Sequence, residues 1–398
     1  MEKDLTPFLK GGESYNLANE IIQTLILRGY KSYFAGGCVR DAIIGKSYHD
    51  LDIVTEALPE QIEKLFFGRT IPVGKKFGII IVHQKGINVE VATFRKDGNY
   101  IDGRRPDHID YGNESEDARR RDFTINALFY DPIRHQIIDH VGGLKDIERK
   151  VIQTVGKPEI RFQEDYLRVL RLFRLAENLH FSIEPKTLSS AQNLFYQLDK
   201  LSSERKRDEL FKSFFRVKNQ YQVVLNYQKY GLWKVYFNQT ELFVPEVFFI
   251  HPCNEEISLL CSLLWNIDDY KKVLKSLKLS SKQETFITKV LKMKSQIHKI
   301  LENEEGEKRF LCLTKEFRLL MKMMMTIDPG NLEVARLWSW CQVYDKNPPK
   351  PLLAGSDLVD FFQGKELGFA LDLVFKEQLI QNWREKELAL SWLLKQKK

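Results

Sequence analysis

The sequence predicts an α+β fold in which a head built around a small mixed sheet precedes a long, all-helical remainder. Over roughly the first 150 residues, short β-branched runs alternate with glycine-bearing turns and helical stretches. Beyond Gly156, apolar residues recur almost everywhere at intervals of three and four, which is the spacing of amphipathic helices. A proline cluster (Pro348, Pro349 and Pro351) indicates a late boundary before a final helical stretch.

The individual elements follow from the same patterns. We expect strands at 33–35, 51–54, 78–82 and 89–94, and head helices at 16–27 and 59–66. In the helical part, the three- and four-residue spacing is clearest at 165–176, 203–215, 256–265 and 281–301.

The composition is that of a globular protein, because 43% of the residues are hydrophobic and both charge signs occur throughout. The formal net charge of +7 suits a polyanionic partner, although many basic proteins bind none. The five cysteines are scattered without CxxC spacing, which indicates neither a disulfide scaffold nor a zinc site. Because the sequence has no apolar signal core and no run of about 18 apolar residues, we expect a cytoplasmic protein.

An apolar strand runs directly into Gly36 and Gly37, and a helix is expected to start near Val39. Two glycines allow the backbone to approach a phosphate closely, and a helix N-terminus offers free N–H groups to it. Arg40 adds a positive charge for the same oxygens. Most glycine pairs of this kind are simply tight turns, so the pattern is informative only in combination with others.

Asp50 and Asp52 flank Leu51 in an otherwise apolar strand. Residues i and i+2 of a strand project from the same face, so the two carboxylates are expected to converge. Such acids repel each other, and a hard divalent cation such as Mg2+, bound together with a triphosphate, removes that cost. The alternative is a strand end with two solvated acids. Glu90, in the next alternating run, is either a third metal ligand or an ordinary exposed strand acid.

A polar, glycine-bearing loop is expected at 97–105, and it leads to three consecutive arginines at 119–121. Adjacent arginines repel one another and favour a polyanionic partner, although such runs are often only solvated surface. If the residues that follow are helical, Asp122 and Asn126 are neighbours at i and i+4 and could meet ribose hydroxyls.

A polar stripe marks the first helix of the helical part. Asp165, Arg168, Arg171 and Arg174 recur every three residues, and the leucines and phenylalanine between them form the apolar side. Such a stripe is usually an ion-paired surface. Aspartate and arginine held on a rigid helix can, however, also meet the donors and acceptors of a base edge.

Four segments, in this order and spacing, carry a resemblance to a known family: GGCVRD with HDLDIV, RRDFTINA, and EDYLRVLRLFR. They resemble the class II tRNA nucleotidyltransferase and bacterial poly(A) polymerase family. The resemblance implies a polymerase-β-like head, followed by a helical neck, body and tail. The corresponding ranges are 1–150 for the head, 151–215 for the neck, 216–347 for the body and 348–398 for the tail.

By position, the resemblance implies a nucleotide site in the head. Gly37 and Arg40 would contact the triphosphate of the incoming nucleotide. Asp50 and Asp52 would be the catalytic residues and would hold Mg2+. Arg121, in the RRD segment, would bind the incoming nucleotide.

The resemblance also implies how the nucleotide is chosen. Asp122 would take part in ribose recognition. Asp165 and Arg168 would present a protein template to cytosine or adenine, with further nucleotide contacts from Arg171 and Arg174. The implied activity is the addition of C, C and A to the 3′ end of tRNA from CTP and ATP. The basic helical region would grip the tRNA acceptor stem.

Two other functions stay open from the sequence. The first is a sister enzyme, either a poly(A) polymerase or a tRNA nucleotidyltransferase that adds only A. The segment VGKKF partly resembles an element of bacterial poly(A) polymerases. The loop at 97–105 resembles the loop that accompanies the switch from C to A addition in this family, which implies an enzyme that is not restricted to C. The second is an inactive RNA-binding protein on the same scaffold. The presence of both Asp50 and Asp52 disfavours it.

Overall fold

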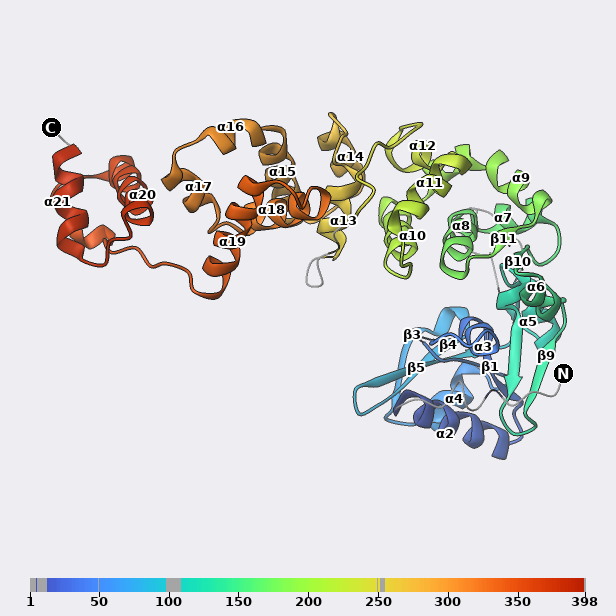
Figure 1. Cartoon of the computed structure of the whole chain (residues 1–398). Coiled ribbons are helices and arrows are strands. Elements are labelled where there is room, and N and C mark those ends of the chain that lie inside the picture. Colours follow the sequence, from blue (N-terminus) through green and yellow to red (C-terminus); the bar gives the residue numbers. More distant parts are fainter. Residues whose placement is uncertain are drawn as a thin grey trace. The chain divides into compact units, whose positions relative to one another are not determined.

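The computed structural model describes Leu5 and residues 13–48, 50–97, 109–248, 250 and 255–396. The chain forms two compact units, Met1–Val217 and Lys218–Lys398 (Figure 1). The first unit holds the sheet and its helices, and the described residues of the second unit form helices and connecting segments without strands. The further division of the chain into head, neck, body and tail remains a prediction.

A seven-stranded mixed sheet with the order β3-β4-β5-β2-β1-β8-β9 forms the centre of the first unit. Its strands are β1 (Ser32–Ala35), β2 (Asp52–Thr55), β3 (Thr70–Gly74), β4 (Ile79–Gln84), β5 (Ile87–Thr93), β8 (Leu128–Asp131) and β9 (Gln136–Asp139). The four predicted strands are all present, and β2 pairs with β5 in parallel while the other neighbours are antiparallel. The sequence patterns missed β3, which contains Pro72, β8, which is buried throughout and so lacks alternation, and the four-residue strand β9.

Helices and small strand pairs complete the first unit. The helices are α2 (Glu13–Leu27), α3 (Gly37–Ile43), α4 (Pro59–Leu65), α5 (Glu114–Arg120), α6 (Gly143–Arg149), α7 (Pro158–Glu164), α8 (Leu167–Leu179), α9 (Pro185–Asn193) and α10 (Ser203–Phe214). Short 3-10 turns are η1 (Lys75–Phe77), η2 (Thr124–Asn126) and η3 (Phe195–Lys200). The strand pairs are β6 (Arg95–Asp97) with β7 (Ile109–Tyr111), and β10 (Val151–Ile152) with β11 (Ser182–Ile183).

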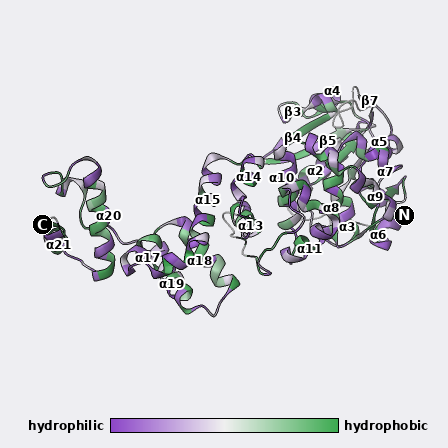
Figure 2. Cartoon of the chain, turned by 90° about the horizontal axis from the view of Figure 1, so that it is seen from above, coloured by the Kyte–Doolittle hydropathy of each residue, from purple (hydrophilic) through white to green (hydrophobic). Residues whose placement is uncertain are grey.

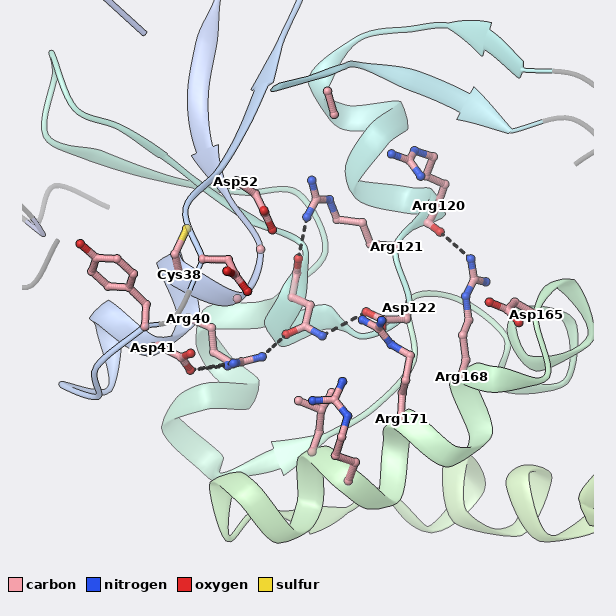
Figure 3. A pocket seen from close by; sticks show the side chains of 18 of the residues that line it. Cys38, Arg40, Asp41, Asp52, Arg120, Arg121, Asp122, Asp165, Arg168 and Arg171 are labelled. Atoms are coloured by element: carbon pink, nitrogen blue, oxygen red, sulfur yellow. Dashed lines mark hydrogen bonds and ion pairs between the residues drawn. The ribbon is translucent and has the colours of Figure 1, made fainter. Parts of the chain in front are cut away.

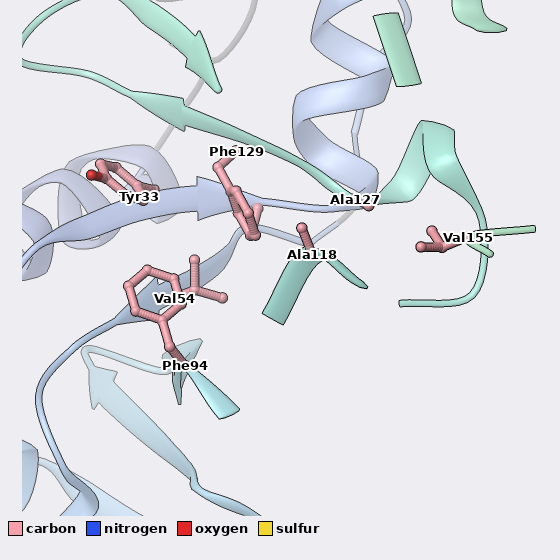
Figure 4. Close-up of a cluster of buried hydrophobic side chains, with 8 residues drawn as sticks. Tyr33, Val54, Phe94, Ala118, Ala127, Phe129 and Val155 are labelled. Atoms are coloured by element: carbon pink, nitrogen blue, oxygen red, sulfur yellow. The ribbon is translucent and has the colours of Figure 1, made fainter. Parts of the chain in front are cut away.

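The two faces of the sheet have different roles. On one face α2 covers β1, and the ring of Tyr15 stacks on Phe34 with 6.0 Å between ring centroids. On the other face an aromatic cluster lies between the sheet and Ala118 of α5 (Figure 4), in which Phe94 and Phe129 meet edge to face. Because side chains alternate along a strand, Asp52 projects on this second face, two residues before Val54 of the cluster.

The second unit consists of paired amphipathic helices, whose hydrophobic and hydrophilic residues alternate along the ribbon in Figure 2. Its helices are α11 (Gln220–Tyr230), α12 (Leu232–Phe237), α13 (Glu255–Leu263), α14 (Tyr270–Ser276), α15 (Ser281–Ser295), α16 (Ile297–Glu302), α17 (Glu305–Leu311), α18 (Lys315–Ile327), α19 (Leu332–Lys346), α20 (Gly364–Gln381) and α21 (Lys386–Gln396). The single helix expected at 281–301 is broken at Gln296. None of the helices in the described part of the chain is long and apolar enough to cross a membrane.

We predict that Gly143→Ala destabilises the first unit, because α6 approaches η2 too closely for a side chain. A Cβ at position 143 would lie 2.2 Å from the carbonyl oxygen of Thr124. Forcing the two backbones apart should cost about 1–3 kcal/mol, which a thermal melt detects as a lower Tm. The matched control is Gly368→Ala in α20, where a Cβ meets nothing within 4 Å. An unchanged Tm for Gly143→Ala would contradict the close approach.

Candidate active site

A cavity of about 550 Å³ opens in the first unit beside the second face of the sheet (Figure 3). Its walls combine arginines and aspartates from segments far apart in the sequence. The arginines are Arg40, Arg95, Arg120, Arg121, Arg168, Arg171, Arg174 and Arg216, and the aspartates are Asp41, Asp50, Asp52, Asp122 and Asp165. Every site residue expected from the sequence lines this cavity except Glu90. His49 and the loop expected at 97–105, apart from Asp97, lie outside the described residues.

The paired acids differ from the sequence-based expectation in one respect. Strand β2 begins at Asp52, so Asp50 precedes the strand and is exposed, whereas Asp52 is half-buried. Burial raises the pKa of Asp52 to about 6; the negative charges of Glu90 and Asp50 add to this effect and Arg121 opposes it. A carboxylate that is costly to ionise in this way is suited to hold a cation.

Glu90 lies next to Asp52 in the register of the parallel strands β2 and β5. It is exposed and does not line the cavity. Among the described residues, no three His, Cys, Asp or Glu side chains are grouped so that they could hold a metal ion. A role for Glu90 as a third metal ligand therefore stays a prediction, and its charge contributes to the high pKa of Asp52.

The two acids nevertheless fit a divalent cation that is shared with a phosphate substrate. Within the described residues, the Asp52 carboxylate accepts no hydrogen bond and forms no ion pair, although it is half-buried. Magnesium is typically held by only one or two carboxylates, and substrate phosphates and water complete its coordination. Asp50 and Asp52 provide that number of ligands.

The glycine pair forms the turn from β1 into α3, which begins at Gly37 rather than near Val39. Gly36 has φ 75° and ψ −128°, a conformation that favours glycine, and a Cβ there would lie 3.0 Å from Nη1 of Arg121. One turn later, the buried Arg40 donates to Asp41 at 2.7 and 2.8 Å and to Oδ1 of Asn126 at 2.5 Å. The turn and its arginine thus form one wall of the cavity.

The residues after Arg120 do not continue as an α-helix, although the pairing of Asp122 with Asn126 was expected only for a helix. Helix α5 ends at Arg120, and Asn126 closes the 3-10 turn η2. The two side chains still meet, because Nδ2 of Asn126 donates to Oδ1 of Asp122 at 3.1 Å. Nη1 of Arg121 donates to the Asn126 carbonyl oxygen at 3.1 Å, and its guanidinium lies over the Phe129 ring.

Asp122 connects this segment to α8. Nε and Nη2 of Arg171 approach its Oδ2 at 2.8 and 2.7 Å, and the backbone N–H of Phe123 donates to its Oδ1. Burial alone would raise the pKa of Asp122, but Arg171, Arg168 and Asn126 lower it to about 2. The carboxylate therefore stays ionised and holds the arginine at the cavity wall.

The four residues of the polar stripe do not all lie on one helix, although the sequence had suggested it. Helix α8 begins at Leu167, so Asp165 precedes it, and Oδ1 of Asp165 accepts the N–H of Leu167 at 3.1 Å. Both oxygens of Asp165 lie 3.1 Å from Nη2 of Arg205. Arg168 donates to Glu164 at 2.5 Å and to the carbonyl oxygen of Arg161 at 2.9 Å. Asp165 and Arg168 thus line the same cavity, but each is held in place by different partners.

Acids that the sequence analysis did not single out hold most of these arginines. Glu209 on α10 accepts from Arg174 at 2.5 Å. Asp117 is fully buried; burial would raise its pKa, but Arg121 and Arg120 keep it below the usual value. The i, i+4 spacing of Arg205 and Glu209 was visible in the sequence, but their partners Asp165 and Arg174 were not, because these lie 40 and 35 positions away along the chain.

Comparison with known proteins identifies the family. A model of the "Poly A polymerase head domain" matches residues 32–153, and one of the "Probable RNA and SrmB- binding site of polymerase A" matches residues 180–243. The CCA-adding enzyme of Bacillus pumilus (strain SAFR-032) is 36% identical over 405 residues, covering 96% of this chain and 97% of the relative. The chain belongs to the CCA-adding enzyme family.

Other CCA-adding enzymes are similar as well. That of Staphylococcus epidermidis is 34% identical and covers 77% of this chain and 75% of its own length. The crystal structure of the Bacillus stearothermophilus CCA-adding enzyme in complex with CTP matches with a TM-score of 0.80 at 26% identity, covering 97% of this chain and 98% of that chain. The Thermotoga maritima CCA-adding enzyme complexed with tRNA, at 20% identity and a TM-score of 0.65, shows likeness of fold alone. The predicted family, fold class and nucleotidyltransferase activity class are therefore confirmed.

We predict that Asp122→Asn lowers the free energy of unfolding by about 2 kcal/mol at pH 7, because it removes the charge that faces Arg171. Since the folded pKa lies below the unfolded one, this contribution is complete above about pH 5 and is lost as the pH falls towards 2. Urea unfolding at pH 7, 5 and 3.5 should show the two proteins converging. Asp208→Asn, at an exposed acid on α10, is the control and should show no such trend. A pH-independent difference would rule out the ion pair as the cause.

Proposed function

We propose that this protein adds C, C and A in turn to the 3′ end of tRNA, using CTP and ATP with Mg2+. The observation that carries the proposal is the presence, in one cavity, of two acids suited to a cation and an aspartate–arginine pair suited to a base edge. Membership of the CCA-adding enzyme family supports the choice of substrate. Eight arginines around the same cavity match the charge of a nucleoside triphosphate and an RNA end.

The proposed reaction is an in-line displacement at the α-phosphorus of the nucleotide. The RNA 3′-oxygen forms a bond to this phosphorus as it loses its proton, and the bond to the β-phosphate oxygen breaks, so that pyrophosphate leaves. Asp50 and Asp52 would hold the cation, which would supply a lower pKa for the attacking hydroxyl and offset phosphate charge. Arg40 and Arg121 neutralise further charge from fixed positions, so positioning and electrostatics account for most of the acceleration.

Nucleotide selection is assigned to Asp165 and Arg168. Cytosine and adenine both present an amino donor beside a ring-nitrogen acceptor, whereas uracil and guanine present the reverse order. A carboxylate acceptor beside a guanidinium donor complements the first pattern and opposes the second. Arg205 and Glu164 hold the two side chains in place, and the carboxylate of Asp165 keeps lone pairs for a base. Asp122 and Asn126, already bonded to each other, are proposed to orient the nucleotide near its ribose.

The two alternatives are less well supported. In the element VGKKF, Lys75 is bound to Glu63 of α4 at 2.6 Å, a contact that serves the local fold of the turn rather than an RNA chain. A role as an RNA-binding protein without activity does not account for a half-buried Asp52 whose ionisation is costly.

A transfer assay tests the proposal and separates it from both alternatives. The protein is incubated with Mg2+ and labelled CTP or ATP, with tRNA lacking CCA, ending in CC or complete, and with oligo(A). We expect C, C and A to be added to the truncated tRNA and synthesis to stop there. Addition of A alone to the CC-ending tRNA would indicate an A-adding enzyme. Long tails on oligo(A) would indicate a poly(A) polymerase, and no incorporation would leave RNA binding only.

We predict that Asp52→Asn abolishes transfer, with a fall of at least about 100-fold, while the metal-free protein becomes as stable as the wild type or more stable. The amide removes a buried negative charge that Glu90 and Asp50 repel, which should stabilise the fold by about 1–3 kcal/mol. Transfer rates and urea unfolding without divalent cations measure the two effects. Glu60→Gln, on the exposed side of α4, should change neither by much. Loss of stability in Asp52→Asn would mean that Asp52 serves the fold.

A further inference from the structure

The cavity continues beyond the acids and arginines described above, along the sheet towards its β3 edge. Its lining there is apolar, formed by Ala92 of β5 and Ile79 of β4, which are partners in the register of the two strands. On its other side Ala92 is the partner of Val54, two residues after Asp52 in β2. These side chains therefore lie on the sheet face that carries Asp52, and they form a floor that leads away from it.

Phe77 stands at the far end of this floor. It is the last residue of η1, it lines the cavity, and it is 38% exposed. Nη1 of Arg95 donates to the Phe77 carbonyl oxygen at 2.5 Å, which ties the turn to β6 and brings a positive charge to the same wall. An aromatic residue at the cavity is thus held by a hydrogen bond from an arginine side chain to its carbonyl oxygen, and it is not buried in the core.

The two ends of the cavity offer different chemistry. The end at Asp165 and Arg168 presents fixed donors and acceptors suited to the edge of one base. The end at Phe77 presents an apolar floor, an aromatic residue and a cation, which suit the face of a base and a phosphate. The proposed reaction requires two nucleotides, and in-line displacement places the attacking 3′-oxygen and the departing pyrophosphate on opposite sides of the α-phosphorus. The end at Phe77 is the one left for the RNA terminus.

The order of addition would account for the apolar and aromatic lining that the described residues provide at this end. The 3′-terminal nucleotide is first the base that precedes CCA, then the first C, and then the second C. A site that accepts each of these in turn cannot depend on one pattern of donors and acceptors. Stacking on an aromatic ring tolerates any base, because every base has a π-face.

We propose that Phe77 is the stacking platform for the 3′-terminal base of the RNA acceptor, and that Arg95 neutralises the adjoining phosphate. This assignment rests on the proposed function and adds a binding residue for the acceptor strand to it. Phe77 acts by binding and orienting the RNA end, and the incoming nucleotide is bound elsewhere in the cavity.

The test compares two acceptors, a tRNA lacking CCA and the same tRNA with an abasic 3′-terminal nucleotide that keeps its 3′-hydroxyl. The rate of C addition is measured with the full-length protein at saturating CTP. Phe77→Ala should lower kcat/KM for the intact acceptor by roughly 5- to 50-fold, the range of a lost base–aromatic stack, and leave the KM for CTP unchanged. On the abasic acceptor, wild type and Phe77→Ala should differ by less than about 2-fold, because the base that stacks is absent. Phe77→Tyr keeps the ring and should restore most of the activity.

Phe67→Ala is the matched control, since Phe67 is 90% exposed and does not line the cavity. It should leave both acceptors unaffected. An equal loss on the intact and abasic acceptors, or a raised KM for CTP in Phe77→Ala, would overturn the assignment. Failure of the wild type to add C to the intact acceptor would instead overturn the proposed function, so the two failures are distinguishable.

Discussion

A buried chain of hydrogen bonds joins three elements of the active site, and the cavity depends on it. Arg40 of α3 donates to Asn126 of η2, and both Asn126 and Arg171 of α8 donate to Asp122. Arg40, Asn126 and Asp122 are all buried, so the loss of one partner would leave a buried polar group without its hydrogen bond. These hydrogen bonds therefore fix α3, η2 and α8 relative to one another, and with them the cavity walls that would face a nucleotide.

Arginines can be crowded around this cavity because acids lie behind most of them. Each ion pair offsets repulsion between neighbouring guanidinium groups and restricts their rotation, so the entropy of ordering is lost during folding rather than on binding. The N–H groups that remain can then meet phosphates or a base without rearrangement. The pairs are Arg120 and Arg121 with Asp117, Arg168 with Glu164, Arg174 with Glu209, and Arg171 with Asp122.

The carboxylates beside the sheet show the opposite arrangement. Asp52 is half-buried, with Glu90 beside it in the next strand and Asp50 close by, and these effects raise its pKa instead of lowering it. The positive charges of the arginines are thus neutralised by acids of the protein itself. The negative charge at Asp52, by contrast, is costly unless a cation is bound. A charged group that lowers the stability of the fold is typical of functional sites, where the charge is needed once the substrate is bound.

The sequence by itself determined the fold class, four strands of the sheet, the helical remainder and the predicted site residues other than Glu90 that line the cavity, because period-two and three-to-four spacing and short motifs are local properties of a chain. Other lining residues, such as Arg95 and Arg216, were not indicated by any motif. Tertiary structure decided the order of the sheet, the position of Glu90 outside the cavity, and the acid that holds each arginine. Asp122 and Arg171 are bonded across 49 positions, and Asp165 and Arg205 across 40. Such pairs form only when the strands close into a sheet and α8 and α10 pack together, since no local pattern specifies which distant side chains then meet.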